Sequence, residues 1–453
     1  MSLFEPTIFR ENDIRGIYPQ DFNKKVAYQI GRVFVEFLLS KIRDSKSKIR
    51  VLVGRDMRLS SPEIFSGLSQ GLIEQGASVF DAGLVPTDFI YSMTARLNYQ
   101  AGLMITASHN PKEYNGLKMI IWQGGPAIKI INGKTIGDLI NRKIQSVESR
   151  GEMKKVGHWQ EYLKHIFSFV DLKKIKPLKI IVDAGNGMAG KVIPLMVKKI
   201  SCQITPLFFE LDGNFPNHLP NPLTPGVLED LGKAVVRAGA DFGVVFDGDA
   251  DRIFLVDEQG EAVFSDQLIL LLAKKILAKN PGGGIVYTLN FSRAVPEFIK
   301  KMGGQPIRSR VGYRFISQAM KENNGLMGGE LACHFSFRDN FYIDSGFIAF
   351  LILLEIISEE NKPLAKLVKD YKIYFKSPEI NVKTKGIFKK LDLVKEKYRD
   401  GKIDELDGLT VDYQDWWFNL RLSNTEPVAR LTIEAKTPEM LEIKKRELMR
   451  LIK

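Results

Sequence analysis

The sequence has little cysteine, little histidine and no long apolar run, and each scarcity excludes a class of protein. Its 453 residues include only two cysteines, Cys202 and Cys333, so neither a disulfide framework nor a cysteine zinc cluster can be built. The longest apolar run, residues 347–354, is far shorter than the roughly 20 residues of a transmembrane helix. The first residues lack the basic and then apolar pattern of a secretory signal. We therefore expect a cytoplasmic protein without membrane association.

The net charge of +12 leaves nucleic acids, acidic membranes and small anionic substrates as candidate partners. Lysines are scattered, and short clusters such as KSKIR and IKKRELMR are more typical of solvated helix faces. No basic stripe interleaved with aromatic residues and no known nucleic-acid motif stands out. We therefore expect small anionic molecules as partners, and no nucleic acid.

The length exceeds what one hydrophobic core usually supports, so several domains are expected. Short apolar runs at 49–56, 178–187 and 240–252 read as strands that end in polar loops, with amphipathic stretches between them. One such stretch, 61–76, begins with Ser61 as N-cap and Pro62 at the first helical position. This alternation predicts α/β units with buried parallel or mixed strands.

Two internal similarities indicate that one α/β unit is repeated three times. YQAGLMITASHN, GADFGVVFDGDADR and NGLMGGELACH each have small residues, a strand and then a polar loop, while 76–93 resembles 304–320. Each copy would deliver one loop to a shared site. Changes in composition predict domains at 1–152, 153–256, 257–370 and 371–453, the last a smaller α+β domain.

DGDADR places Asp247, Asp249 and Asp251 at alternate positions in a glycine-containing loop after a buried strand. Such a density of negative charge is costly unless a cation neutralises it. An EF-hand is excluded because Arg252 stands where that loop needs glycine, and the next residues read as a strand. A solvated acidic turn remains an alternative, but Mg²⁺ sharing its ligands with a phosphate is favoured.

TASHNP contains Ser108 beside His109, one of only five histidines. A hydrolase is disfavoured because no G-x-S-x-G elbow surrounds the serine, and an adjacent histidine would not normally face it as a base. A phosphorylated serine needs no triad; it needs a metal, cationic groups and in-line placement. The other polar loops offer these groups.

Three further loops contribute candidate groups. GNGMAGKV is close to a P-loop, but Val192 follows its lysine where a hydroxyl is required, so it reads as a turn from strand to helix. RLSNTEPVAR carries guanidinium, hydroxyl and amide groups that suit a phosphate dianion, although an ordinary turn is the alternative. In GGELACH, Glu330 can accept hydrogen bonds from sugar hydroxyls, and a surface loop is the alternative.

TASHNP, DGDADR, the GGE-led loop and RLSNTEP, in this order, resemble the four active-site loops of the α-D-phosphohexomutase superfamily, especially phosphomannomutase/phosphoglucomutase. FRENDIRG, VGRDMRLSS, NGLK, DGNFPNHLPNP and VGYRF also match, and the resemblance covers nearly the whole chain. It implies three similar mixed-sheet α/β domains and a C-terminal TATA-binding-protein-like α+β domain around a central cleft. It also implies loops for phosphoserine, metal, sugar and phosphate in domains I to IV.

The resemblance implies that hexose 1-phosphate and 6-phosphate, of mannose or glucose, interconvert through phosphoserine and a bound hexose 1,6-bisphosphate. Mg²⁺ would be held by Asp247, Asp249, Asp251 and the Ser108 phosphate. The implied catalytic residues are Ser108, Arg15, Lys118, Arg252 and His334. The implied substrate-binding residues are Glu330, Arg310, Tyr313, Arg421, Ser423, Asn424, Thr425 and Arg430.

Two departures from the family pattern concern the sugar. Ala332 stands where the bifunctional loop has serine, and Tyr313 stands where histidine is common. Phosphoglucosamine mutase is the alternative within the fold, although its serine loop more often reads SASHNP. A silent sugar-phosphate sensor is the alternative from another class. We expect a monomer or a weak homodimer.

Overall fold

The computed structural model describes residues 5–41, 48–142, 144, 147, 150–383, 386–422 and 428–452. It divides into two compact units. The first comprises Met1–Phe264 with Ala332–Ala365, and the second comprises Ser265–Leu331 with Lys366–Lys453. Each unit is described by itself.

The first unit opens with a seven-stranded sheet in the order β1-β5-β4-β2-β3-β7, with β6 paired to β5. Its strands are β1 (Ile14–Ile17), β2 (Arg50–Arg55), β3 (Ser78–Leu84), β4 (Ala101–Ile105), β5 (Tyr114–Ile121), β6 (Lys129–Ile131) and β7 (Met153–Lys155). Its helices are α1 (Lys24–Leu39), α2 (Ser61–Glu74), α3 (Thr87–Arg96) and α4 (Gly133–Gly137).

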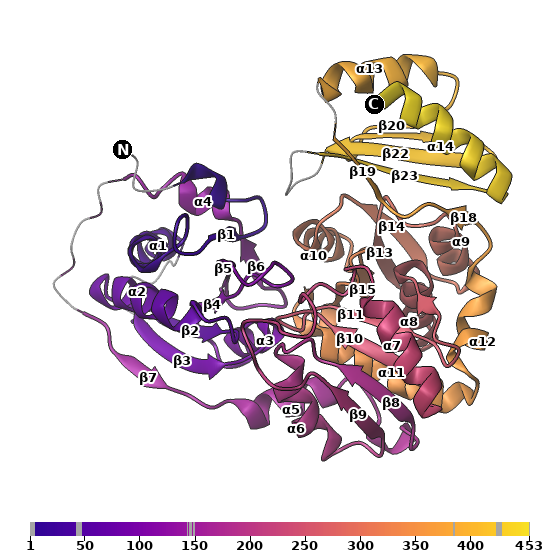
Figure 1. Ribbon diagram of the computed structural model, residues 1–453. Coiled ribbons are helices and arrows are strands. Elements are labelled where there is room, and N and C mark those ends of the chain that lie inside the picture. The colour runs from indigo at the N-terminus through magenta and orange to yellow at the C-terminus, as the bar shows by residue number, and fades with distance from the viewer. Residues whose placement is uncertain are drawn as a thin grey trace. The chain divides into compact units, whose positions relative to one another are not determined.

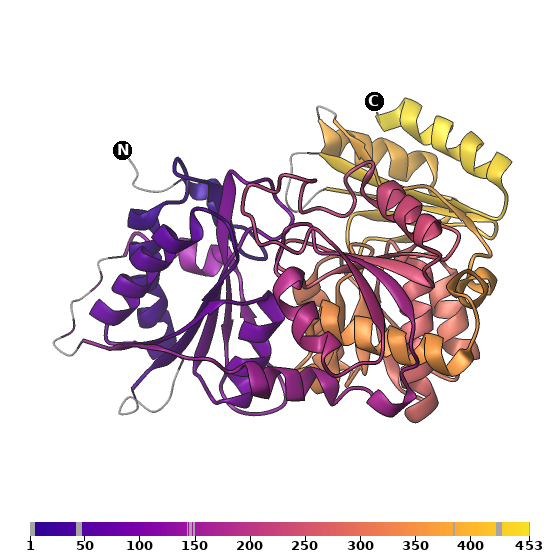
Figure 2. The ribbon, with the colours of Figure 1, turned by 60° about the horizontal axis from the view of Figure 1, so that its bottom comes forward.

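The two faces of this sheet carry different helices (Figures 1 and 2). Val51, Val53 and Leu103 share one buried cluster with apolar residues of α1 and α2. Gly54 and Gly102 face Ile90 of α3 so closely that an added Cβ would lie within about 3 Å of it. The alternation along β2 and β4 therefore sandwiches the sheet between helices, as buried strands of α/β folds require. Helix α2 starts one residue earlier than expected, because Ser60 is the N-cap and Ser61 the first helical residue.

The second sheet has five strands in the order β12-β11-β10-β8-β9. These are β8 (Lys179–Asp183), β9 (Gln203–Leu207), β10 (Phe242–Phe246), β11 (Ile253–Val256) and β12 (Ala262–Val263), and the helices are α5 (Trp159–Phe167), α6 (Ala189–Val197) and α7 (Val227–Ala238). GNGMAGKV forms the expected turn from β8 into α6. The segment 332–365 of the same unit contains β16 (Phe335–Phe337) and β17 (Ile343–Asp344), which pair antiparallel outside this sheet, and α11 (Gly346–Glu360), which packs against β11 and α5.

The second unit contains α8 (Ser265–Lys279), β13 (Gly284–Thr288), α9 (Ala294–Lys301), β14 (Gln305–Ser309), α10 (Tyr313–Glu322) and β15 (Met327–Gly329), and α12 (Leu364–Val368) spans the boundary between the units. An antiparallel six-stranded sheet follows in the order β18-β23-β22-β21-β20, with β19 paired to β23. Its elements are β18 (Phe375–Lys376), β19 (Ile380–Val382), α13 (Ile387–Lys397), β20 (Lys402–Asp404), β21 (Leu409–Asp412), β22 (Trp416–Leu422), β23 (Ala429–Ala435) and α14 (Pro438–Ile452).

The same strand pattern occurs three times. In each case a central strand pairs in parallel with the next strand in sequence and with the one after it: β2 with β3 and β4, β8 with β9 and β10, and β13 with β14 and β15. The third strand of each set leads into TASHNP, DGDADR or the Glu330 loop. The predicted triplication is borne out by this topology, and the predicted fold class, three mixed-sheet α/β domains and an antiparallel α+β domain, is confirmed.

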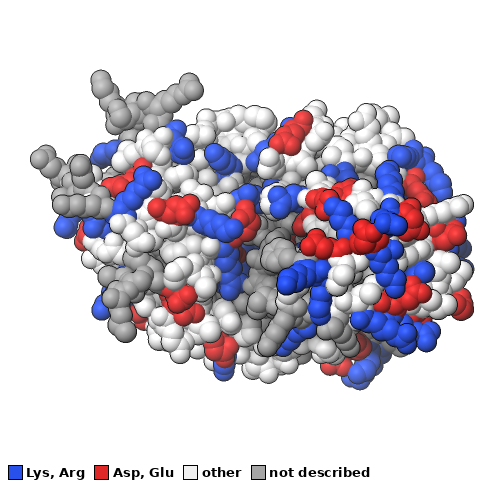
Figure 3. Space-filling view, turned by 90° about the horizontal axis from the view of Figure 1, so that it is seen from above, with Lys and Arg blue, Asp and Glu red and all other residues white. Residues whose placement is uncertain are grey.

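None of the described helices is long and apolar enough to cross a membrane; the apolar run at 347–354 lies inside α11. On the face seen in Figure 3, basic and acidic side chains alternate over much of the right-hand part. The predicted solvated face at IKKRELMR lies on α14, where Arg446 and Arg450 are exposed and Leu448 is buried. Residues 46 and 47 of the KSKIR cluster lie outside the described residues.

Candidate active site

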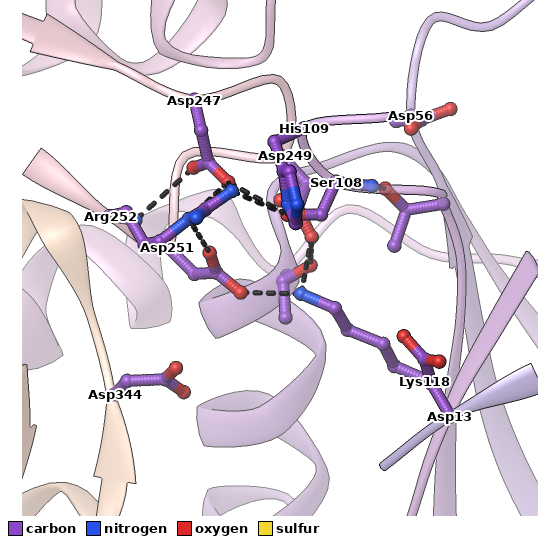
Figure 4. Close-up of polar contacts among 12 residues, drawn as sticks. Asp13, Asp56, Ser108, His109, Lys118, Asp247, Asp249, Asp251, Arg252 and Asp344 are labelled. Carbon is purple, nitrogen blue, oxygen red and sulfur yellow. Dashed lines mark hydrogen bonds and ion pairs between the residues drawn. The ribbon is translucent and has the colours of Figure 1, made fainter. Parts of the chain in front are cut away.

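Ser108 lies in the tight turn that follows β4. It adopts a left-handed backbone conformation (φ 49°), and its N–H donates to the Thr106 hydroxyl at 2.9 Å. Its own hydroxyl donates to Oδ2 of Asp247 at 2.8 Å, while Arg252 Nη2 lies 3.3 Å from the Ser108 Oγ (Figure 4). The side chain is therefore turned toward the acidic loop and placed between a carboxylate and a cation.

His109 departs from the expectation that it would not face Ser108. Its Nδ1 lies 3.4 Å from the Ser108 Oγ, at the outer limit of a hydrogen bond. Burial lowers the pKa of His109 well below its ordinary value, and the cationic Arg252 and Arg15 lower it further. The shorter contact of Ser108 is still the one to Asp247, which is not the geometry of a serine hydrolase.

A buried arginine that the sequence analysis did not single out holds the Ser108 turn. Arg58 has no exposed side-chain surface, and its Nε pairs with Asp56 at 3.2 Å. The other four N–H groups donate at 2.6 to 3.0 Å to the backbone carbonyls of residues 108, 110, 111 and 114. All five guanidinium donors are thus used, and the ring of Phe215, from the DGNFPNHLPNP loop, lies 5.1 Å from the guanidinium carbon.

The three aspartates of DGDADR are buried together between β10 and β11. Asp247, Asp249 and Asp251 each offer a carboxylate oxygen within 4.8 Å of the others. Burial raises the pKa of Asp247 to about 6, and the two neighbouring carboxylates act in the same direction. Burial by itself would raise the pKa of Asp251 as well. Interactions with Lys118, His334 and Arg252 outweigh it and hold the pKa of Asp251 well below its ordinary value.

This acidic cluster fits a divalent cation. Carboxylate oxygens are the ligands that Mg²⁺ prefers, and Oδ1 of Asp249 is buried without a hydrogen-bond partner within the described part of the chain. Lys118, on β5, bridges Oδ2 of Asp249 (2.7 Å) and Oδ2 of Asp251. The Thr87 hydroxyl, at the start of α3, also donates to Oδ2 of Asp249, and the Thr87 N–H donates to the Asp249 carbonyl at 3.2 Å.

Arg252 and His334 also border the acidic cluster. Arg252 Nε donates to Asp247 at 2.8 Å, and the backbone of Arg252 pairs with that of His334. His334 Nε2 lies 3.3 Å from Asp251 and 3.6 Å from Asp344. Asp344, on β17, was missed by the sequence analysis; burial and the nearby Asp251 charge raise its pKa to about 7. Its only local signal was an aspartate at the end of a short β-prone stretch.

Arg15, on β1, reaches the Ser108 turn through Asn110. Its Nη1 donates to the Asn110 side-chain oxygen at 2.6 Å, and its Nη2 pairs with Asp13. The first unit therefore brings six of the predicted residues together: Ser108, Lys118, Asp247, Asp249, Asp251 and Arg252. His334 lies beside Asp251, and Arg15 lies beside the Ser108 turn.

The remaining predicted residues belong to the second unit. Glu330 follows β15, and its carbonyl accepts from Ser265 at 2.8 Å. Arg310 precedes α10 and lies over the Phe315 ring, and Tyr313 is the first residue of that helix. Arg421 and Arg430 lie on β22 and β23. Ser423, Asn424 and Thr425 lie outside the described residues.

Four domain profiles of one family match successive parts of the chain. They are phosphoglucomutase/phosphomannomutase alpha/beta/alpha domain I at residues 6–146, domain II at 160–260, domain III at 264–374 and the C-terminal domain at 379–449. Together they span most of the sequence in the expected order.

Full-length relatives agree with this assignment. A phosphomannomutase of Vibrio cholerae is 37% identical over 460 residues, covering 99% of both chains. A phosphomannomutase/phosphoglucomutase of Pseudomonas aeruginosa is 36% identical over 452 residues, covering 96% of this chain and 93% of its own. A crystal structure of a phosphoglucomutase/phosphomannomutase family protein from Burkholderia thailandensis superposes with a TM-score of 0.88 at 31% identity, covering 99% of this chain and 97% of that one. The chain belongs to the phosphoglucomutase/phosphomannomutase family of intramolecular phosphotransferases.

Proposed function

We propose that this enzyme interconverts hexose 1-phosphate and hexose 6-phosphate, of mannose or glucose or both, through a phosphoserine at Ser108 and a bound hexose 1,6-bisphosphate. The observation that carries the proposal is the placement of Ser108 Oγ between Asp247 (2.8 Å) and Arg252 (3.3 Å). A phosphoryl group on this oxygen would lie beside both the acidic cluster and a guanidinium, which are the partners that phosphoryl transfer requires.

Asp247, Asp249, Asp251 and the Ser108 phosphate would hold Mg²⁺. When bound, the ion would offset part of the negative charge of the three carboxylates and of the transferring phosphoryl group. Oδ1 of Asp249, which is buried and has no hydrogen-bond partner among the residues that the structure describes, supports this assignment.

In the first half-reaction the bond between the serine oxygen and phosphorus breaks, and a bond from phosphorus to a sugar hydroxyl oxygen forms. The hydroxyl proton leaves to a nearby base, and Ser108 regains a hydroxyl group. In the second half-reaction the bisphosphate, turned end over end, returns its other phosphoryl group to Ser108. The starting phosphoenzyme is restored and no phosphate is consumed.

The cations around Ser108 have a common task in this scheme. Arg15, Lys118, Arg252 and His334 are assigned to stabilise the developing negative charge or to assist proton transfer. Lys118 pairs with Asp249 and Asp251, and His334 Nε2 lies 3.3 Å from the same Asp251, so both side chains border the carboxylates assigned to the metal. A dense set of fixed cations lowers the barrier because charge in a loose phosphoryl-transfer transition state sits on the peripheral oxygens.

The second unit would recognise the end of the sugar that does not react. Arg421, Ser423, Asn424, Thr425 and Arg430 are assigned to hold the non-reacting phosphate, and Glu330, Arg310 and Tyr313 to contact the sugar. Because either phosphate must be accepted in turn, recognition of charge by guanidinium groups suits this task better than recognition of one hydroxyl pattern.

A coupled assay tests the proposal. Full-length protein with Mg²⁺ and a trace of glucose 1,6-bisphosphate would receive glucose 1-phosphate, mannose 1-phosphate and glucosamine 1-phosphate in separate reactions. Formation of a 6-phosphate, with phosphate found on Ser108 by mass spectrometry, is the expected result, and relative rates identify the sugar. Release of free phosphate would indicate a phosphatase, and saturable binding without turnover would indicate a sensor; either would refute the mutase.

A further inference from the structure

Two arginines face each other across the last pair of strands. Arg421 of β22 and Arg430 of β23 are cross-strand partners in the antiparallel register, so their side chains leave the same face of the sheet. The Arg421 side chain is only 2% exposed. Like charges placed directly opposite each other destabilise a sheet. Arg430 is 24% exposed, so one buried and one partly buried guanidinium group lie opposite each other, and an anion close by would offset their repulsion.

The chain supplies such an anion itself. Glu379, immediately before β19, uses both carboxylate oxygens: Oε2 lies 2.8 Å from Arg421 Nη2 and Oε1 lies 3.1 Å from Arg430 Nη1. The Asn290 amide, after β13, lies 3.4 Å from the same Oε2. Glu379 thus bridges the two guanidinium groups assigned to phosphate recognition.

The bridge rests on fixed supports. Gly408 (φ 71°) packs so closely beneath Arg421 that an added Cβ would lie 2.5 Å from the Arg421 Cβ. Asn290 is 2% exposed, and its side-chain oxygen accepts from the Thr288 hydroxyl at 2.7 Å. The Glu379 carboxylate is therefore held in place against both guanidinium groups.

We propose that Glu379 sets how tightly the two arginines hold a phosphate group. By cancelling one of the two positive charges it weakens phosphate binding, so that a bisphosphate can leave the arginines and return with its other phosphate. This inference rests on the proposed function, because only a mutase needs the same arginines to release an intermediate and bind it again in reverse. An arginine pair without this carboxylate would bind more tightly and release more slowly.

Isothermal titration with glucose 6-phosphate tests the inference on the full-length chain. All variants would carry Ser108→Ala, so that heat reports binding and not turnover. Glu379→Gln keeps the size of the side chain and removes its charge, and we expect the Kd to fall by about tenfold because a like charge beside the phosphate is gone. Glu379→Asp keeps the charge, so its Kd should stay well above that of Glu379→Gln. An unchanged or weaker affinity of Glu379→Gln would overturn the proposal.

Two controls separate this inference from the function on which it rests. Glu297→Gln, on α9, removes one charge from the same unit at a residue that pairs with the Tyr374 hydroxyl, and its Kd should stay at the reference value. If Glu297→Gln lowered the Kd for glucose 6-phosphate as much as Glu379→Gln does, a specific role of Glu379 would be refuted. Arg421→Gln should weaken binding strongly; unaltered binding would refute the phosphate site itself, whereas weakening without a gain from Glu379→Gln would refute only the role of Glu379.

Steady-state kinetics with Ser108 intact give a second readout. Glu379→Gln should lower KM for the hexose 1-phosphate and also lower kcat by several-fold, because release of the intermediate slows. If Glu379 only organised the arginines, its loss would raise KM. A raised KM would therefore contradict the proposal.

Discussion

The Ser108 hydroxyl donates a 2.8 Å hydrogen bond to Asp247 across 139 residues of sequence. This contact joins the turn after β4 to the loop after β10, which are equivalent positions in two copies of the same α/β unit. Repetition of the fold thus places a candidate phosphoryl carrier and a candidate metal ligand against each other. The site is formed by topology more than by any local motif.

Ser108→Ala should abolish turnover, because no other oxygen occupies the position between Asp247 and Arg252 within the described residues. Binding of glucose 6-phosphate, measured by isothermal titration, should change by less than about threefold since the substituted group carries no net charge in the unphosphorylated protein. Ser201→Ala, at an exposed serine, serves as the control and should keep wild-type activity. Full turnover by Ser108→Ala would exclude the phosphoserine mechanism.

Thr87→Val should weaken metal binding. The Thr87 hydroxyl orients Asp249 through Oδ2, and loss of such a supporting hydrogen bond typically lowers metal affinity by about 10- to 100-fold. Binding of Mn²⁺ as a spectroscopic probe would be measured by electron paramagnetic resonance. Thr87→Ser, which keeps the hydroxyl, should restore most of the affinity.

Thr94→Val is the matched control for that substitution. Thr94 is buried on the same helix, but its hydroxyl donates at 2.6 Å to the Ile90 carbonyl of that helix. Its variant should bind Mn²⁺ as the wild type does. Equal loss of affinity in both valine variants would show that Thr87 acts only through helix stability.

Arg58→Lys should destabilise the fold and reduce labelling of Ser108. Lysine can replace at most three of the five donors, so carbonyls of the Ser108 turn lose their partners in a buried site; a loss of at least about 3 kcal/mol is expected. Chemical unfolding and the fraction of Ser108 phosphorylated by glucose 1,6-bisphosphate would be measured together.

Arg55→Lys provides the comparison for Arg58→Lys. Arg55 lies in the same segment and pairs with Asp81 at 2.8 Å, but its side chain is 20% exposed. Its substitution should cost less than about 1 kcal/mol. Equal stability and equal Ser108 labelling in the two lysine variants would remove Arg58 from the account of the turn.

The clustering of the three aspartates could be predicted because its sequence signal is local. Three aspartates at alternate positions after an apolar run already imply a cation, and the buried cluster of Asp247, Asp249 and Asp251 agrees with that inference. The repeat could be predicted for the same reason, since the strand and its following loop recur within a short stretch of sequence each time.

The supporting residues could not be predicted because their partners are distant or carry no side-chain signature. Arg58 binds backbone carbonyls, which every residue possesses, and Thr87 meets Asp249 across 162 residues. The segment SPEI gives no local sign that Glu379 has a role. Pairing of β19 with β23 brings Glu379 close to Arg430. Such contacts exist only once the sheets are assembled.

Asp88 should make stability depend on pH between about 4 and 7. Burial raises the pKa of Asp88 to about 7. Hydrogen bonds from the Ser345 and Tyr162 hydroxyls lower this pKa, and the charges of Asp251 and Asp344 raise it. Because its pKa is higher in the folded than in the unfolded state, its contribution is fully present below about pH 4 and is lost as the pH rises through about 7.

Asp88→Asn removes this titration and keeps an oxygen that can accept from Tyr162. Unfolding by urea would be followed from about pH 4.5 to 8 in metal-free buffer, where carboxylate charges are not offset by bound cations. The wild type should lose stability relative to Asp88→Asn by on the order of 3 kcal/mol across this range. Asp138→Asn, at the exposed end of α4, is the control and should leave the pH profile unchanged. If the difference in free energy of unfolding between Asp88→Asn and the wild type did not change with pH, Asp88 would have an ordinary pKa in the folded protein. Its buried contacts would then have to stabilise the charged form.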